Sequence, residues 1–214
     1  MDAMSTPDTP GWTIIVPVKP AAVGKSRLAD VGTDREALAR AIALDTVTAT
    51  AAADHVSRVL VVTDDPGVRA ELRRLRGVEV VAEGDTRGLD AAIALGAEAA
   101  GVGCPRAALL GDLPALRPAD LDAALELAAS VERGLVPDAE ATGSTLVTAR
   151  AGAVWVSAFG EESAARHRLL GCTDLAVERE SSLRRDVDTA AQLSQAVALG
   201  VGPRTAAVLA SAAA

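Results

Sequence analysis

Short runs of β-branched residues alternate with longer alanine-rich stretches along most of this chain. The clearest run is Val56–Thr63 (VSRVLVVT), which is typical of a buried strand, and Arg35–Ala53 before it carries apolar residues at helical spacing. Strands separated by helices of this length are typical of βαβ units. The alternation therefore predicts an α/β fold with a Rossmann-like, doubly wound and mainly parallel sheet.

The other expected elements continue this rhythm up to about residue 132, where it changes to a small late β excursion. Further strands are expected at Thr13–Val18, Val78–Ala82, Ala107–Leu110, Thr145–Ala149, Ala153–Val156 and Leu175–Val177. Further helices are expected at Val68–Leu75, Leu89–Ala100, Ala119–Val131, Ser163–Leu170, Thr189–Leu199 and Pro203–Ala214. Pro118 suits the first position of the helix that follows it.

Composition supports layers of helices on a sheet. Hydrophobic residues make up 50% of the 214 residues but aromatic residues only 1%, so alanine, valine, leucine and isoleucine must form the core. Small side chains let helices approach a sheet closely. The length predicts one domain over residues 12–214, after a polar lead-in at residues 1–11 that is expected to be disordered.

The charge and the apolar pattern exclude several classes of protein. A net charge of -8 argues against nonspecific nucleic-acid binding, which needs a basic surface. We find no apolar run of membrane-spanning length and no signal-peptide pattern, and Cys104 and Cys172 lack metal or redox spacing. These features predict a cytoplasmic protein without a membrane or nucleic-acid partner, and a homo-oligomer is compatible with them.

The only two lysines of the chain lie six positions apart, directly after the first expected strand. Lys19 and Lys25, with Ser26 and Arg27, put three cations and a hydroxyl into one short connection. On an acidic protein, such a loop predicts a local anion site, with a polyphosphate as the leading ligand. A solvated surface loop is the alternative interpretation.

This loop does not match a P-loop, although Gly24-Lys25-Ser26 resembles the end of one. The P-loop pattern needs glycine at position 19, where this chain has lysine. Pro17 and Pro20 also remove backbone donors that a phosphate cradle would use. We therefore expect side chains to hold the phosphates.

Polar clusters follow four of the expected strands, at the ends where open parallel sheets bind ligands. The clusters are Lys19–Arg27, Thr63-Asp64-Asp65, Glu83–Asp90 and Gly111-Asp112. Ordinary turn chemistry is the alternative for each cluster alone.

Asp112 is the best metal candidate, because Gly111 lets a ligand approach and carboxylates suit Mg²⁺. Asp186 and Asp188 lie on one face of an extended segment and could add a second carboxylate. Asp188 could instead cap the helix that starts near Thr189.

A second anion pocket is expected where Gly160-Glu161-Glu162-Ser163 opens a helix. The first amides of a helix have no intrahelical partner and favour anions, although the two glutamates would repel an acidic ligand that they faced. His167 lies on the same helical face as Ser163, where it could contact a substrate or be structural. Order and spacing indicate no Ser-His-Asp or Cys-His arrangement.

Several of these motifs together resemble one family. Val16-Pro17-Val18-Lys19-Pro20 followed by Gly24-Lys25-Ser26-Arg27-Leu28 is similar to the opening motif of the 2-phospholactate guanylyltransferases, whose actinobacterial branch uses phosphoenolpyruvate in the biosynthesis of coenzyme F-420. The likeness continues in the expected order through Thr63-Asp64, Arg87-Gly88-Leu89-Asp90-Ala91-Ala92, Gly111-Asp112-Leu113-Pro114, Ser144-Thr145, Phe159-Gly160 with Ser163, Arg185-Asp186-Val187-Asp188-Thr189 and Gly202-Pro203-Arg204-Thr205.

The resemblance implies a nucleotidyltransferase domain of the nucleotide-diphospho-sugar transferase (GT-A-like) type. Such an enzyme joins the phosphate of a small phosphorylated acid to the α-phosphorus of GTP and expels pyrophosphate, with Mg²⁺ as cofactor. The implied nucleotide-binding residues are Lys19, Lys25, Ser26, Arg27, Thr63, Asp64, Arg87, Gly88, Leu89, Asp90 and Gly111. Lys19, Lys25, Arg27 and Asp112 would be the catalytic residues.

The implied acceptor is phosphoenolpyruvate or 2-phospholactate, received by Thr145, Gly160 and Ser163. The implied metal ligands are Asp112 with Asp186 or Asp188. Many relatives carry asparagine where this chain has Asp90, whose carboxylate could still accept from guanine. Two other functions stay open: a nucleotidyltransferase with a molybdopterin or sugar-phosphate acceptor, and a nucleotide-binding module without catalysis.

Overall fold

The computed structural model describes residues 11–19, 34–85 and 87–212. Within them, seven strands form one sheet in the order β3-β2-β1-β4-β6-β5-β7. The strands are β1 (Trp12–Pro17), β2 (Val56–Val62), β3 (Val78–Val81), β4 (Arg106–Leu109), β5 (Arg133–Pro137), β6 (Ser144–Ala149) and β7 (Thr173–Asp174). Only β6 runs antiparallel to its neighbours, so the mainly parallel α/β sheet is confirmed.

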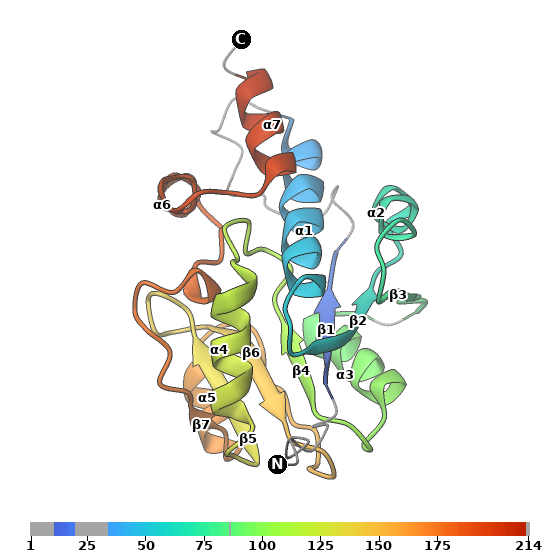
Figure 1. Cartoon of the computed structure of the whole chain (residues 1–214), viewed down its shortest axis with the longest axis vertical. Helices are drawn as coiled ribbons and strands as arrows, with labels where there is room; N and C mark the ends of the chain where they lie inside the picture. Colours follow the sequence, from blue (N-terminus) through green and yellow to red (C-terminus); the bar gives the residue numbers. More distant parts are fainter. Residues whose placement is uncertain (1–10, 20–33, 86, 213–214) are drawn as a thin grey trace, which may run out of the picture.

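Helices cover both faces of the sheet (Figure 1). The helices are α1 (Arg35–Ala51), α2 (Pro66–Leu72), α3 (Leu89–Ala100), α4 (Pro118–Ala128), α5 (Ser163–Leu169), α6 (Ala190–Leu199) and α7 (Pro203–Ala212). The side chains of β1 alternate: Ile14 and Val16 pack with α1, α2 and α4, whereas Ile15 packs with α3. This period of two explains why the strand is buried along its whole length.

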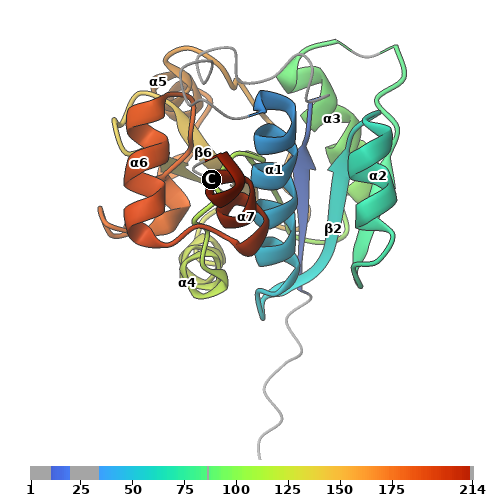
Figure 2. The ribbon, with the colours of Figure 1, turned by 90° about the horizontal axis from the view of Figure 1, so that it is seen from above.

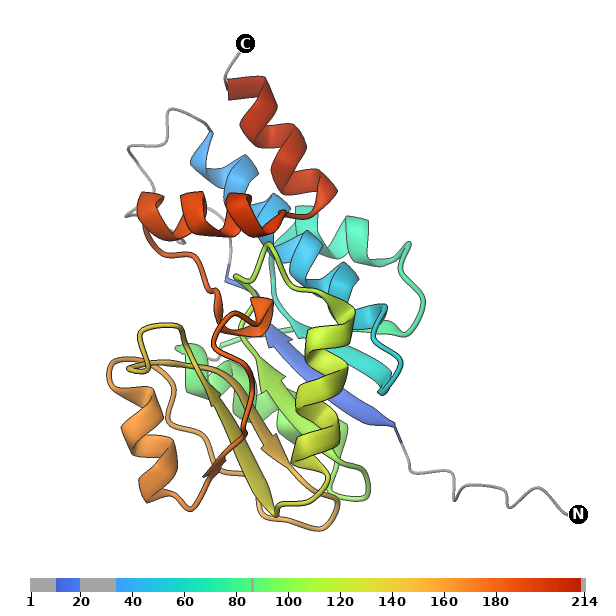
Figure 3. The ribbon, with the colours of Figure 1, turned by 60° about the vertical axis from the view of Figure 1, so that its left-hand side comes forward.

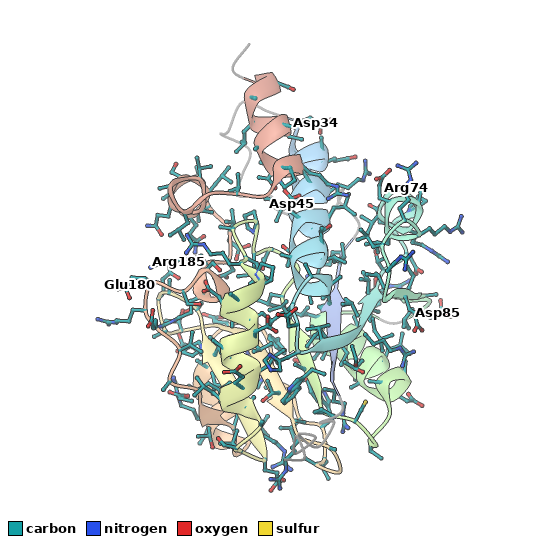
Figure 4. All side chains as sticks on the ribbon, viewed as in Figure 1. Asp34, Asp45, Arg74, Asp85, Glu180 and Arg185 are labelled. Carbon is teal, nitrogen blue, oxygen red and sulfur yellow. The ribbon has the colours of Figure 1, made fainter. Side chains whose placement is uncertain are left out.

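The last two helices return to the first one. Leu193 and Ala196 of α6 share a buried cluster with Leu38 and Ile42 of α1, and α7 packs on the same helix (Figures 2 and 3). Asp45 of α1 lies beside the start of α7 (Figure 4), where its carboxylate accepts the backbone N–H groups of residues 204 and 205 at 3.2 and 2.7 Å. No helix in the described part of the chain is long and apolar enough to cross a membrane.

One expected strand is wrong and one strand was missed. Residues 153–156 are not a strand, because β6 already pairs with β4 on one side and β5 on the other. The carbonyl groups of Ala153 and Val154 accept from Arg106 and Arg133 instead of from a strand. The missed strand, β5, contains Gly134 and Pro137, which favour an irregular segment in the sequence.

The other boundaries differ by a few residues. The last expected strand, at residues 175–177, is displaced to β7, although the Leu175 N–H still donates to the Leu135 carbonyl at 2.9 Å. Pro118 is the first residue of α4, as predicted, and Gly200 follows the last residue of α6.

Candidate active site

A cavity of about 770 Å³ opens at the carboxyl ends of β1 and β4. The sheet order reverses between these strands, because the chain builds β2 and β3 on one side of β1 and continues with β4 on the other. Crevices of this kind are where open α/β sheets bind ligands. The residues that line the cavity come from the end of β1, from α1, from the start of α3, from the β4–α4 and β5–β6 loops, from the start of α5 with the loop before it, and from the segment before α6.

Lys19 is the cation that the described residues contribute to this cavity from the end of β1. Its chain segment is held in place because the Val18 N–H donates to the Val62 carbonyl of β2 at 2.9 Å. Lys19 itself is exposed. Lys25, Ser26 and Arg27, which the sequence assigns to the same anion site, lie outside the described residues.

The loop that carries Gly111 and Asp112 lies against the end of β1. A Cβ atom at Gly111 would stand 3.0 Å from the Pro17 carbonyl oxygen, so a larger residue would push the two segments apart. The Val187 N–H donates to the Asp112 carbonyl at 3.0 Å. This bond brings the Asp186–Asp188 segment beside Asp112 across 75 positions of sequence.

Four carboxylates meet on this side of the cavity. Burial, followed by the negative charges of Asp112, Asp138 and Asp188 in that order, raises the pKa of Asp186 to about 8. The Oδ1 atom of Asp186 is buried and has no hydrogen-bond partner among the described residues. A buried carboxylate among like charges favours either a proton or a cation.

The acidic residues around Asp186, called the acidic cluster below, include two that the sequence did not reveal, Asp138 and Glu140. Carboxylate oxygens of Asp138, Glu140 and Asp186 lie within 4.8 Å of one another. Asp138 follows β5, whose carboxyl end lies at the same edge of the sheet as those of β1 and β4. The rule that located Asp112 would have found Asp138 if β5 had been recognised as a strand.

Asp138 also shapes the loop that carries it. Its two carboxylate oxygens accept the N–H groups of Thr142 and Gly143 at 3.0 and 2.7 Å. The guanidinium of Arg184 donates to the carbonyl oxygens of Pro137 and Asp138 at 3.0 and 2.8 Å. These bonds join the β5–β6 loop to the segment that leads to Asp186.

Asp188 is not the residue that caps α6. Thr189 accepts the N–H of Gln192 at 3.3 Å, and the Gln192 side chain accepts the N–H of Thr189 at 3.0 Å, which together form a capping box. Asp188 precedes this cap and lines the cavity. The capping role that the sequence left open for Asp188 therefore belongs to its neighbour.

Another part of the cavity wall contains Ser144, Phe159, Gly160 and Ser163, and Glu161 and Glu162 line the cavity between the last two. Gly160 has φ +111°, a conformation that favours glycine. Thr145, which the resemblance assigns to the acceptor, is buried in β6, and its Oγ1 lies 3.4 Å from the Val136 carbonyl. Its neighbour Ser144 lines the cavity instead.

The residues expected at the nucleotide lie on the loops after β2 and β3 and at the start of α3. The side chain of Asp64 accepts the N–H groups of Glu83 and Gly84 at 3.1 and 2.9 Å, so it ties these two loops together. Thr63 is buried and its hydroxyl accepts the Asp65 N–H at 3.1 Å.

The rest of that group begins α3. Arg87 is exposed and donates to the Gly84 carbonyl at 2.9 Å, and Gly88 is the N-cap of the helix with φ +94°. Asp90 accepts the N–H of Phe159 at 2.9 Å, and Leu89 lines the cavity. Helix α3 thereby contacts both the expected nucleotide side and the wall that contains Gly160.

Solved structures of known proteins share this fold. A nucleotidyl transferase from Methanothermobacter thermautotroptrophicus has a TM-score of 0.56 and 19% identity, with 86% of this chain and 95% of that chain covered. A 4-diphosphocytidyl-2C-methyl-D-erythritol synthase has a TM-score of 0.60 and 13% identity, with 89% and 99% covered. A protein described as a "putative nucleotide-diphospho-sugar transferase" from Desulfovibrio desulfuricans G20 has a TM-score of 0.58 and 16% identity, with 88% and 96% covered, so the expected type of fold is confirmed.

Curated relatives are much closer in sequence. The phosphoenolpyruvate guanylyltransferase of Thermomonospora curvata is 48% identical over 203 residues, which cover 93% of this chain and 89% of the relative. The one of Streptomyces coelicolor is 49% identical over 204 residues, which cover 93% and 96%. The model of the family described as "Guanylyl transferase CofC like" matches residues 12–195. This chain therefore belongs to the CofC-like guanylyl transferase family.

Proposed function

We propose that this protein transfers GMP from GTP to the phosphate of phosphoenolpyruvate and releases pyrophosphate, as the names of its curated relatives suggest. The observation that carries the proposal is one cavity lined by Lys19 and by the carboxylates of Asp112, Asp186 and Asp188. A cation and an acidic cluster in one crevice suit a substrate made of phosphates and their counter-ion. 2-Phospholactate is the related acceptor that the assay below must separate from phosphoenolpyruvate.

The reaction needs no nucleophilic side chain. An oxygen of the acceptor phosphate attacks the α-phosphorus of GTP, and the bond from that phosphorus to the bridging oxygen breaks as pyrophosphate leaves. The protein has to bring two polyanions together and offset the charge on the leaving group. Lys19 is placed for this task, and we assign Lys25, Ser26 and Arg27 of the following segment to the same triphosphate.

The acidic cluster fits a hard divalent cation, for which we propose Mg²⁺. The buried Oδ1 of Asp186 has no hydrogen-bond partner in the described part of the chain, and carboxylate oxygens are the ligands that Mg²⁺ prefers. Asp112, Asp186 and Asp188 would hold the ion, with Asp138 next to them. When bound, Mg²⁺ would supply positive charge against the charge that develops on the pyrophosphate.

The other side of the cavity suits the acceptor. Gly160 and Ser163 line the cavity at the start of α5, and Ser144 adds a hydroxyl from β6. We assign Gly160, Ser163 and the Ser144-Thr145 pair to the small phosphorylated acid. The nucleotide is assigned to the side formed by Gly111 and by the residues from Thr63-Asp64 and Arg87-Gly88-Leu89-Asp90.

The test is pyrophosphate release from GTP with Mg²⁺ and each of three acids: phosphoenolpyruvate, 2-phospholactate and 3-phosphoglycerate. We expect turnover with phosphoenolpyruvate, and mass detection should find the guanylylated acid. Binding of GTP without pyrophosphate release from any pairing would indicate a nucleotide-binding module. Turnover only with a molybdopterin or a sugar phosphate would indicate a different acceptor.

Asp112→Asn tests the assigned site. The amide keeps the shape of the side chain but removes the charge that a cation needs, so we expect turnover to fall by roughly 10²-fold or more while the thermal midpoint stays near that of the wild type. Asp174→Asn is a matched control, because Asp174 is exposed and pairs only with Arg168 among the described residues. Wild-type turnover by folded Asp112→Asn would remove Asp112 from the site.

A further inference from the structure

His167 is a buried polar residue that the proposed chemistry does not use. It lies in α5 with an exposed fraction of 0%, behind the wall of the cavity and not on its surface. Both nitrogen atoms of its ring are engaged: Nδ1 lies 2.9 Å from the Ser144 hydroxyl, and Nε2 lies 2.8 Å from the backbone nitrogen of Ala158. The ring therefore joins two separate segments of the chain.

These contacts determine where the proton of the ring lies. The Ala158 N–H can only donate, so Nε2 must accept and carries no proton. Nδ1 then holds the proton and donates it to the Ser144 Oγ. Burial lowers the pKa of His167 to about 4, so the ring is neutral near pH 7 and has one donor and one acceptor.

The segment held by Nε2 leads directly to the cavity. The next amide after Ala158 is that of Phe159, and it donates to Asp90 of α3 at 2.9 Å. The Phe159 ring packs edge-on against the His167 ring with centroids 4.8 Å apart. Two successive amides are thus held by side chains from two different helices, immediately before Gly160 turns into the cavity wall.

The segment held by Nδ1 places a hydroxyl at the same wall. The Ser144 Oγ accepts from His167, which leaves its own hydrogen for another acceptor, and Ser144 lines the cavity. Ser144 and Gly160 come from β6 and from the loop before α5, and His167 is the residue bonded to both segments. An anion at this wall would meet the Ser144 hydroxyl and the amides at the start of α5, with the carboxylates of Glu161 and Glu162 also lining the cavity there.

We propose that His167 is a positioning residue for the acceptor: it orients the Ser144 hydroxyl and holds residues 158–160 so that this wall receives the anionic groups of the phosphorylated acid. The proposal rests on the proposed function. His167 does not touch the reacting atoms, so its removal should weaken acceptor binding and leave GTP binding intact.

The experiment compares His167→Phe with His167→Gln. Phenylalanine keeps a ring against Phe159 but loses both hydrogen bonds, whereas the side-chain oxygen of glutamine can still accept the Ala158 N–H. We expect the KM for phosphoenolpyruvate to rise about tenfold or more in His167→Phe, with the KM for GTP within about twofold of the wild type. His167→Gln should recover a large part of the loss.

The only other histidine provides a matched control. His55 lies immediately before β2 and contacts Asp122 and Glu126, at the opposite end of the strands from the cavity. His55→Phe should change neither KM. If His167→Phe does not fold, His167→Asn replaces it with the same expectation, because the asparagine amide can still donate to Ser144 but no longer reaches Ala158.

The outcomes separate the two proposals. A folded variant with an unchanged KM for phosphoenolpyruvate, or with equal rises in both KM values, would overturn the role of His167 alone. A wild-type protein that releases no pyrophosphate from GTP with any of the three acids would overturn the proposed function, and the acceptor role of His167 with it.

Discussion

Asp186 acquires its high proton affinity from residues that are distant in sequence. Burial raises its pKa most, followed by the charges of Asp112, Asp138 and Asp188, and of these three residues only Asp188 is close along the chain. An aspartate in an unfolded chain would titrate near 3.8. Holding this carboxylate ionised among like charges destabilises the folded protein, which is a cost expected at a site built to bind a cation.

Asp186→Asn should therefore stabilise the metal-free protein. Between pH 3.8 and about 8 the folded chain holds a proton that the unfolded chain has lost, so the free energy of unfolding falls as pH rises through this window. Asparagine removes this dependence. We expect the variant to melt a few degrees above the wild type at pH 8 in a chelating buffer, since about 2–4 °C corresponds to each kcal/mol at this length.

The difference in melting temperature between Asp186→Asn and the wild type should shrink toward pH 4, where the wild-type carboxyl binds a proton in the folded state and increasingly in the unfolded state. Thermal denaturation across the pH range measures it, with Asp174→Asn as the surface control. Parallel pH profiles for the wild type and Asp186→Asn would contradict the assignment of the raised pKa to this residue.

At the scale of elements, the contact of α3 with the sheet controls one side of the cavity. Gly96 of α3 lies over β1 and β2: an added Cβ would collide with Ile15 Cγ2 and lie 3.0 Å from Val62 Cγ2. The missing side chain lets the helix approach the strands closely. Because Leu89 and Asp90 begin the same helix, its position also affects the cavity and the Phe159 amide.

Gly96→Ala should destabilise the protein although alanine favours helices. Helix propensity alone would stabilise it by about 1 kcal/mol, but overpacking a buried contact costs about 1–3 kcal/mol, and the two buried strands cannot move away easily. We expect the free energy of unfolding, measured by urea denaturation, to fall by about 1 kcal/mol or more. Gly103→Ala is the control, because an added Cβ there meets no atom within 4 Å. A more stable Gly96→Ala would show that α3 can shift outward freely.

For the whole molecule, one buried carboxylate connects the first helix to the last. Asp45 is buried on α1, and its two oxygens accept the first amides of α7 from Arg204 and Thr205. Gly202 permits this approach, because a Cβ atom there would collide with the Asp45 carboxyl group. The C-terminal helices thus close over α1 (Figure 3), and Asp186 and Asp188 of the segment before α6 line the cavity.

Asp45→Ala should weaken this closure. The substitution leaves the first amides of α7 without their acceptor, and hydrogen bonds to charged groups contribute about 1.5–3 kcal/mol each. We expect the free energy of unfolding to fall by about 2–4 kcal/mol. Asp45→Asn keeps one acceptor oxygen, so its free energy of unfolding should fall less than that of Asp45→Ala. An unchanged unfolding midpoint for Asp45→Ala in urea would show that α7 is held by its apolar contacts alone.

The sequence by itself determined the repeating part of the fold. Strand and helix periods are local properties, so the elements from β1 to α4 could be predicted with boundaries close to those observed. The rule that ligands bind at carboxyl ends placed Lys19 and Asp112 at one edge, and the family motifs covered most of the chain.

Only the tertiary structure decided how the late segments pair and which charges meet. β5 contains glycine and proline, so no local sequence pattern indicates a strand there. It is a strand because β6 and β7 pair with it. Asp138 and Glu140 were therefore not identified as site residues. Residues 153–156 were predicted to be a strand, but β6 has no free edge with which they could pair. The partners of His167 and the raised pKa of Asp186 follow from the same physical cause: hydrogen bonding and burial depend on atoms that the chain brings together only when it folds.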